Sequence, residues 1–408
     1  MTVPVLSIVA IVAAIAIGTL RGVNIGLVSI AFAFAIGFFL VGLPAGEIVA
    51  GWPLNLFFML LGMTLLFGVA RVNGTLGLLA EKMVRATLGH TRLIPPAFFL
   101  LSAVIAAFGA GNIVVCAMVL PIAMTVSVDH RISPLLMATM VIAGSNAGGL
   151  SPIAPTGIIA HSLSAEQGFD IAASIFYKQV IGQSILAVIL YFVLRGHRLE
   201  KRSEAPLERG GAPFAWAQLM TIAVLLLVVG GIVFMGWDIG LTAFAGTVLL
   251  LFLGVANEGE VFRSIPWGPI VLVCGVTVLV NVADGAGGID LLSQQLTRLM
   301  DDHTAAPIMA LIGGTLSLVS SASGVVLPTL IPTVPGLVSE TGGDPAQIIS
   351  AIVMGAHMVT NSPISTLGAL AVASAGYAVD REKLFNQLFL VGIVGLVYAA
   401  LIVYLGIV

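Results

Sequence analysis

Apolar windows of about 20 residues recur along nearly the whole chain, and this feature constrains the fold more than any other. A helix needs about 20 mostly apolar residues to cross a bilayer, and its backbone groups must bond internally there. We therefore expect a series of membrane-spanning helices. Their ranges are 3–20, 23–43, 54–71, 134–163, 175–195, 214–235, 239–256, 267–283, 346–375 and 384–407. Because no basic flank precedes Val3, we expect the first range to be a span and not a signal peptide.

Composition agrees with a membrane protein and excludes several other classes. Of the 408 residues, 59% are hydrophobic and only 9% are charged, whereas a soluble domain has about 25% charged residues. Cys116 and Cys274 both lie in apolar runs, so neither a disulfide framework nor a metal cluster is expected. The net charge of −3 gives no reason to expect a nucleic-acid partner. We predict an all-α polytopic protein whose surroundings are the lipid bilayer.

Two apolar stretches, 93–127 and 306–338, are too long for one straight span and are interrupted near the middle. Gly109-Ala110-Gly111-Asn112 interrupts the first, and residues 320–324, Ser-Ser-Ala-Ser-Gly, interrupt the second. Non-helical backbone at membrane depth is tolerated only where it is buried in protein or lines a wet cavity. We predict a re-entrant hairpin in each stretch, and the simpler alternative is a kink in an ordinary span.

The basic residues predict which way the chain lies in the membrane. With two re-entrant hairpins the number of crossings is even, so both termini lie on one side. If that side is extracytoplasmic, all of the 16 Lys and Arg residues except Lys178 and Arg298 fall in cytoplasmic segments, as the positive-inside rule requires. We predict a multi-pass protein of the plasma (inner) membrane with both termini outside, and a cytoplasmic linker at 196–213.

The second half of the sequence repeats the first. Residues 62–66 match 275–279 at an offset of 213, and from the hairpins onward the offset is 211. The later matches include Pro121 with Pro332, the helix-start pairs Ser133-Pro134 with Asp344-Pro345, and Ser151-Pro152-Ile153 with Ser362-Pro363-Ile364. Each half has an odd number of crossings, so the two copies are oppositely oriented, which is the architecture of secondary transporters.

The repeat divides the chain into two inverted units. The first is 1–195, with a scaffold at 1–92 and a hairpin plus broken helix at 93–174. The second is 214–408, with a scaffold at 214–305 and a hairpin plus broken helix at 306–380.

Gly, Pro, Ser and Asn gather in the two broken spans, at 144–157 and 355–368. Unwound carbonyls and side-chain oxygens suit sodium, and half-helix N-termini suit an anion. The alternative is that Ser and Asn join helices while Gly and Pro make a kink. No Lys or Arg lies in these spans, so an anion would be held by amides and hydroxyls. His357, the one ionisable side chain near a break, is a substrate donor, a protonation site or a neutral packing residue.

With these hairpins and breaks, the chain resembles the ion transporter superfamily, in particular the divalent anion/sodium symporters and the MatC-type malonate/dicarboxylate carriers. The symporters carry Ser-Asn-Thr at each hairpin tip. This chain has Gly111-Asn112-Ile113 before Pro121 at the first tip and Ala322-Ser323-Gly324 before Pro332 at the second, so only Asn112 is unchanged. The resemblance implies a sodium-coupled importer of small dicarboxylates such as malonate, succinate or malate. It also implies a homodimer in which spans near 3–71 and 214–283 form a scaffold while the hairpins and broken spans move as an elevator.

The pattern and the resemblance together give two sets of candidate site residues. Predicted substrate contacts are Asn112, Ile113, Ser151, Pro152, Thr156, Ser323, Gly324, His357, Ser362, Pro363, Ser365 and Thr366. Predicted sodium ligands are Gly111, Asn112, Ser145, Asn146, Gly149, Ser320, Ser321, Ser323, Thr360 and Asn361.

Three alternatives to sodium-coupled import have their own signatures. A proton-coupled carrier would use His357, and a TRAP-like membrane subunit would need a binding protein. A cation/proton antiporter would carry a buried carboxylate, but no Asp or Glu lies in the broken spans.

An intramembrane enzyme is not expected, because His161 and Ser321 belong to no Gly-x-Ser-x-Gly elbow, zinc-binding His-Glu pair or aspartate dyad.

Overall fold

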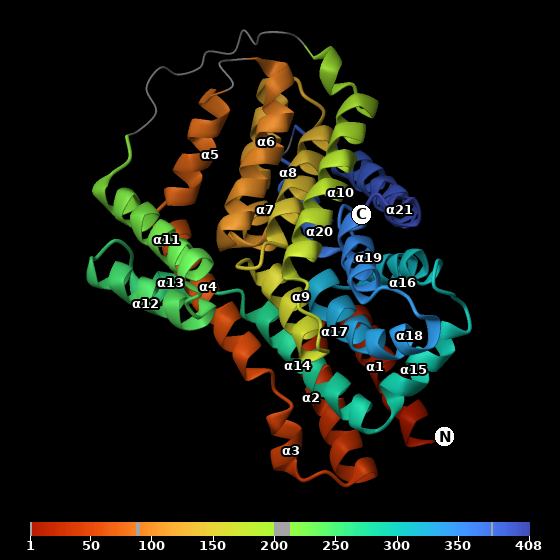
Figure 1. Cartoon of the computed structure of the whole chain (residues 1–408). Helices are drawn as coiled ribbons and strands as arrows, with labels where there is room; N and C mark the ends of the chain where they lie inside the picture. The colour runs from red at the N-terminus through yellow and green to blue at the C-terminus, as the bar shows by residue number, and fades with distance from the viewer. Residues whose placement is uncertain (1, 87–89, 200–212, 377) are drawn as a thin grey trace.

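The computed structural model describes residues 2–86, 90–199, 213–376 and 378–408 (Figure 1). This part of the chain is made of helices and connecting segments without a β-strand, which confirms the predicted all-α fold. Nine helical segments within it are long and apolar enough to cross a bilayer. The protein is therefore a multi-pass membrane protein. The predicted linker at 196–213 lies mostly outside the described residues, which omit 200–212.

The predicted spans and hairpins of the first half are all helical. Its helices are α1 (Val3–Arg21), α2 (Ile25–Ile36), α3 (Ala45–Ala50), α4 (Leu54–Val72), α5 (Thr75–Ala86), α6 (Ile94–Ile105), α7 (Asn112–Asp129), α8 (Pro134–Gly149), α9 (Pro155–Glu166) and α10 (Ala172–Val193). Wider, π-helical turns extend α2 over Gly37–Val41 and α6 over Ala106–Ala110.

The second half follows the same order. Its helices are α11 (Trp216–Met235), α12 (Ile239–Phe252), α13 (Glu258–Ser264), α14 (Trp267–Gly285), α15 (Gly288–Thr297), α16 (Ala305–Val319), α17 (Leu327–Leu330), α18 (Val334–Thr341), α19 (Pro345–Met358), α20 (Thr366–Ala373) and α21 (Arg381–Tyr404). The amphipathic helices α5 and α15, which follow α4 and α14, were not predicted, because they are too short and too polar to meet the criterion for a span.

The first hairpin breaks where the sequence predicts. Gly109 has φ +116° and Gly111 has φ +75°, a region that favours glycine because it has no Cβ. A Cβ on Gly111 would lie 3.1 Å from Pro155 Cδ, so the hairpin tip rests on the start of α9. The helix resumes at Asn112 as α7, and α6 and α7 pack against each other and against α8.

The second hairpin breaks over fewer residues than predicted. Ser320 is extended, with φ −140° and ψ −171°, and Ser321 has φ −87° and ψ 124°. Helical backbone resumes at Ala322, so 322–324 belong to the returning arm. That arm consists of short helical pieces, because Pro328, Pro332 and the following Pro335 lack the N–H that a regular helix needs.

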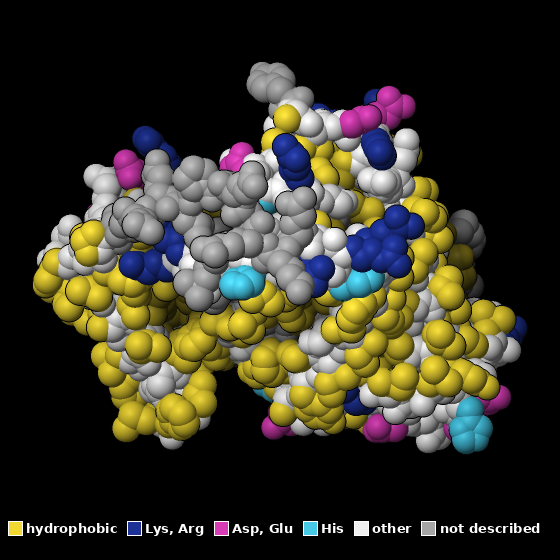
Figure 2. Space-filling view, turned by 90° about the horizontal axis from the view of Figure 1, so that it is seen from above, with side chains coloured by type: hydrophobic (Ala, Val, Ile, Leu, Met, Phe, Trp, Pro, Cys, Tyr) yellow, Lys and Arg dark blue, Asp and Glu magenta, His cyan; other side chains and the backbone are white. Residues whose placement is uncertain are grey.

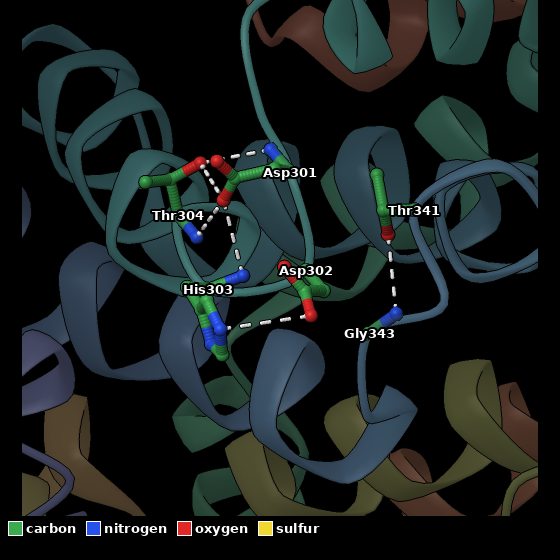
Figure 3. A network of polar contacts seen from close by, with 6 residues as sticks. All are labelled: Asp301, Asp302, His303, Thr304, Thr341 and Gly343. Atoms are coloured by element: carbon green, nitrogen blue, oxygen red, sulfur yellow. Dashed lines mark hydrogen bonds and ion pairs between the residues drawn. The ribbon is translucent and has the colours of Figure 1, made fainter.

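Both ends of the second hairpin meet at one polar turn, shown in Figure 3. Asp301 accepts hydrogen bonds from the backbone N–H of His303 and from both the N–H and the hydroxyl of Thr304, just before α16 begins. These bonds, above all those from Thr304, lower the pKa of Asp301. A Cβ on Gly343, just after α18, would lie 3.7 Å from the Asp302 carbonyl oxygen. The chain therefore enters and leaves this hairpin at the same place, and its re-entrant character stays a prediction.

Both broken spans are present, but the breaks begin later than predicted. Helix α8 is regular through Gly149 and the chain is unwound over 150–154, while α19 is regular through Met358 and the chain is unwound over 359–365. Gly144 and Gly355 lie in regular helix and not in a break, and each allows its helix to pack closely against a neighbouring helix. A Cβ on Gly144 would lie 2.1 Å from the Phe99 carbonyl oxygen, and one on Gly355 would lie 2.0 Å from that of Ala310.

The packing itself repeats at the sequence offset. Phe99 and Ala310 are 211 residues apart, as are Gly144 and Gly355. In the scaffold, α4 packs on α12 and α14 packs on α2, with a glycine at each crossing. Gly62 approaches the Gly240 carbonyl, and Gly275 approaches that of Gly26. The two halves thus use equivalent contacts, whereas their inverted orientation in a bilayer stays a prediction.

Segments predicted to share one side of the membrane contact each other. On the predicted cytoplasmic side, Asn24 Nδ2 donates to the Gly268 carbonyl at 2.8 Å, and Arg92 Nε donates to that of Leu199 at 2.6 Å. On the other side, Asn281 Nδ2 donates to the Gly51 carbonyl at 3.0 Å. Figure 2 shows Lys and Arg side chains over the face seen from above, with hydrophobic side chains around them. The contacts agree with the predicted grouping of loops, and which group is cytoplasmic stays a prediction.

Replacing Gly144 with Val tests the close packing of α8 on α6. The new side chain has no room beside the Phe99 carbonyl, so we expect a loss of about 1–3 kcal/mol from overpacking and a lower Tm in detergent. Gly230→Val in α11 is the control, because a Cβ at Gly230 meets nothing within 4 Å. Equal Tm values for the two variants would contradict the packing described here.

Candidate functional site

A cavity of about 530 Å³ lies between the tips of the two hairpins, at the boundary between the predicted scaffold and the hairpin and broken-helix parts. The scaffold contributes the α1–α2 connection, α4 and the start of α14, and the opposite wall is made by the hairpin tips with the first turns of α9 and α20. The polar lining residues are Asn24, Thr64, Asn112, Thr156, Ser321, Ser323 and Thr366. None of the described residues that line the cavity carries a charge.

Five helices begin at the wall of this cavity. First-turn residues in the lining are Ile25 of α2, Asn112 of α7, Thr156 of α9, Gly268 of α14 and Thr366 of α20. Each helix N-terminus carries roughly half a positive charge, since its first N–H groups have no partner in the helix. Several such ends converging on one space favour a bound anion. The cavity lining therefore offers unpaired helix N–H groups to an anion without Lys or Arg, beside the C-terminal helix ends near Gly18 and Ala110.

Behind the first hairpin tip, a buried hydrogen-bond network joins both broken spans. Asn112 Nδ2 donates to Asn146 Oδ1 at 3.0 Å, and Thr156 Oγ1 donates to Asn112 Oδ1 at 3.2 Å. Asn146 Nδ2 in turn donates to Thr360 Oγ1 at 2.7 Å and to the His357 carbonyl at 3.2 Å. These side chains are at most 6% exposed. The network fixes the first tip against α8, α9 and α19.

At the second break, fewer of the buried polar atoms have hydrogen-bond partners. Asn361 is 1% exposed, and its Oδ1 accepts no hydrogen bond. The unwound carbonyls of 359–365 lie in the same segment. At the tip of the second hairpin, Ser321 Oγ accepts from the Gly324 N–H at 3.1 Å. A buried oxygen without a donor is the chemistry that a hard cation satisfies.

The structure brings eight of the 20 predicted site residues to the cavity wall. Those that line it are Gly111, Asn112, Ile113, Thr156, Ser321, Ser323, Gly324 and Thr366. Asn146, Gly149, His357 and Thr360 lie directly behind it, through the network or against Asn112. The residues that do not line it are Ser145, Ser151, Pro152, Ser320, Asn361, Ser362, Pro363 and Ser365.

Two predicted sodium ligands use their hydroxyls elsewhere. Ser145 Oγ donates to the Ile142 carbonyl at 2.9 Å and lies 3.1 Å from Cys116 Sγ, and Ser320 Oγ donates to the Leu316 carbonyl at 2.6 Å. His357 is fully buried, with Nδ1 2.7 Å from the Val353 carbonyl and no partner for Nε2. Because it does not line the cavity, it does not contact a molecule bound there.

The scaffold side of the site was not predicted. Asn24 caps α2 by accepting from the Gly26 N–H, and it also donates to Gly268 at the start of α14. The cap is readable from the sequence, since Asn precedes an apolar run. Its position at the cavity is not, because it depends on contact with a segment 244 residues away.

A double-mutant cycle between Asn112 and Asn146 tests the network. Each change to Ala leaves a buried amide without its partner, so we expect each to cost about 1–3 kcal/mol. The double variant should cost less than the sum, with a coupling of about 0.5–3 kcal/mol, measured by thermal unfolding in detergent. Asn386→Ala, at an exposed position of α21, is the control. Strict additivity would contradict a direct bond.

Comparison with known proteins gives a match in sequence and matches in fold. Residues 1–149 match the family described as the N-terminus of the dicarboxylate carrier protein MatC. No curated protein matched in a sequence search. In fold, the chain is similar to the YdaH transporter of Alcanivorax borkumensis, with TM-score 0.62 and 15% identity over 95% of this chain and 98% of that one.

A second solved structure of similar fold is MtrF of Neisseria gonorrhoeae, described within a class of antimetabolite efflux pumps. Its TM-score is 0.58, with 14% identity over 88% of this chain and 82% of that one. The family and both structures are of transporters, not enzymes. The family match confirms the resemblance to MatC-type carriers over residues 1–149, the two structures show the fold, and the chain is a multi-pass membrane transporter.

Proposed function

We propose that this transporter carries a small dicarboxylate into the cell, driven by sodium. The main support for an anionic substrate is the cavity, where five helices begin and where the described lining has no negative charge. Its volume of about 530 Å³ falls in the range of small-molecule sites, about 300–1,000 Å³. The family match to a dicarboxylate carrier supports a diacid as the anion.

Hydrogen-bond donors around the cavity suit two carboxylates. Thr366 begins α20, Ser323 and Gly324 follow the second tip, and Asn112 begins α7 at the first tip; all four line the cavity. Donors from several segments suit a molecule with an acceptor at each end. The diacid would lie between the two hairpin tips, with neither end meeting a formal positive charge from the described lining.

Sodium would supply the missing charge. The residues that fit it best are Asn361, with its unpartnered Oδ1, and the unwound carbonyls beside it. At the first break, by contrast, Asn112 and Asn146 already bond to each other and to Thr156 and Thr360. We infer that the second break is the stronger cation site. Bound sodium beside a dianion makes the binding of each favour the other, which is the coupling that symport requires.

The arrangement also supports elevator-type motion in a homodimer. The cavity lies between the predicted scaffold and the predicted moving part, so displacing one against the other carries the site across the membrane. The bonds from Asn146 to Thr360 and His357 tie the two broken spans together. The moving part would travel as one body, with the inverted halves giving an outward- and an inward-facing state.

A proton-coupled carrier is the second candidate, favoured by one observation. His357 Nε2 is buried without a partner, and its backbone carbonyl accepts from Asn146, which bonds to the cavity residue Asn112. A proton on that ring would add positive charge behind the first tip.

Reconstitution separates these candidates. The purified chain is placed in liposomes, and uptake of radiolabelled malonate, succinate and malate is measured with sodium or choline outside. We expect uptake of at least one diacid to collapse in choline. Uptake that ignores sodium and follows an imposed pH gradient would favour the proton-coupled carrier. A chain that transports no diacid alone, but does so with a periplasmic fraction, would be a subunit of a binding-protein-dependent system.

Asn361→Ala tests the cation site. Losing the unpartnered oxygen should raise the sodium concentration for half-maximal uptake by about tenfold or more, equivalent to about 1.4 kcal/mol, while Asn112→Ala should mainly raise KM for the diacid. Ser350→Ala in α19 is the control, because its hydroxyl is also buried without a partner but does not belong to the break. Full transport by both Asn112→Ala and Asn361→Ala would show that the site is placed wrongly.

A further inference from the structure

A second, small cavity continues the main one toward the end of α4. It holds about 10 Å³ and shares Thr64, Ala110, Val114 and Pro266 with the main cavity. Its other lining residues are Phe67, Gly68, Arg71 and Ser264. A Cβ on Gly68 would lie 2.7 Å from Ser264 Oγ, so α4 and α13 are in close contact along this wall. The small cavity thus lies between the site and the exposed end of α4, and its volume is about that of one water molecule.

Arg71 is the one charged residue among the described lining residues of the two cavities. It lies in the last turn of α4 and is exposed, seven residues after Thr64. At 1.5 Å per residue, its Cα is about 10 Å along the helix from the main cavity. That distance is close to the Debye length of about 8 Å at physiological ionic strength. The charge therefore acts on an anion in the solution beside the end of α4 more than on one in the site.

A basic residue in the last turn of a helix also has an ordinary role, since it offsets the negative end of the helix dipole. Two observations point beyond that role here. No carboxylate in the described chain forms an ion pair with Arg71, so its field is not cancelled. The main cavity and the small cavity have mostly apolar walls, and low-dielectric walls focus the field of a nearby charge.

We propose that Arg71 attracts the anionic substrate to the cytoplasmic mouth of the transport path and thereby sets the affinity from that side. This inference rests on the proposed carriage of a dianion and on the predicted cytoplasmic position of Arg71. Arg71 does not line the main cavity, so it acts on the encounter and not on the bound state. Its removal should raise KM without lowering the maximal rate, in a manner that depends on ionic strength and on the side of access.

The test compares KM in inside-out and right-side-out membrane vesicles, with sodium fixed and choline chloride setting the ionic strength. In inside-out vesicles the diacid starts from the cytoplasmic face. There, at about 0.01 M ionic strength, where the Debye length is about 30 Å, Arg71→Gln should raise KM about three- to tenfold. At about 1 M, where that length is about 3 Å, the difference should vanish. In right-side-out vesicles KM should be unchanged at both ionic strengths.

Two further variants make the result specific. Arg71→Lys keeps the charge and should leave KM unchanged. If the guanidinium were needed only for packing, Lys could not take its place and KM would change. Arg85→Gln removes a charge from α5, where Arg85 pairs with Glu81 away from the cavities, and should leave KM unchanged. An Arg71→Gln effect that is equal from both faces, insensitive to salt, or confined to the maximal rate would overturn the inference. Absence of diacid transport by the wild-type chain would instead overturn the proposed function, and this inference with it.

Discussion

Backbone that leaves the helical conformation inside a membrane must find partners other than water, and the rest of this structure depends on that constraint. The described part of the chain has four such places: the two hairpin tips and the two unwound segments at 150–154 and 359–365. The hairpin tips line the cavity, and backbone groups of the unwound segments bond within their own break, as the Ala154 N–H does to the Ser151 carbonyl and the Ser362 N–H to the Val359 carbonyl. Placing the breaks together is what makes them tolerable, and it also concentrates donors and oxygens in one place.

Close approach between helices is the second condition for bringing the breaks together. Glycine at Gly144 and Gly355 lets each broken helix touch the carbonyls of the neighbouring hairpin arm. Glycine at Gly62 and Gly275 does the same for the two scaffold crossings. In lipid, where apolar side chains gain little from leaving the solvent, such van der Waals contact between backbones is a main source of helix association. The site therefore depends on residues that have no side chain and never touch a ligand.

The location of each break was predictable from the sequence, because Gly, Pro and Ser interrupt apolar runs that are otherwise long enough to span. The number of residues in each break was not predictable from the sequence. Gly144 and Gly355 have the composition of a break, but their function is to pack a regular helix. Asn112, Thr156, Ser323 and Thr366, which were expected to face one another, all line the cavity. The contributions of α2 and α14, and the displacement of His357 behind the cavity wall, depend on tertiary contacts that no local pattern records.

The hydrogen bond from Asn146 to the His357 carbonyl joins residues 211 apart, which is the offset of the repeat. In the predicted repeat, a residue that bonds to its own counterpart would lie close to the rotation axis that relates the two copies. For inverted repeats that axis runs parallel to the bilayer plane, at mid-depth. Strict symmetry would require both partners to donate and accept identically, and a single amide facing a carbonyl does not allow this. At this point the predicted repeat is asymmetric, because the first half supplies the donor and the second half supplies the acceptor.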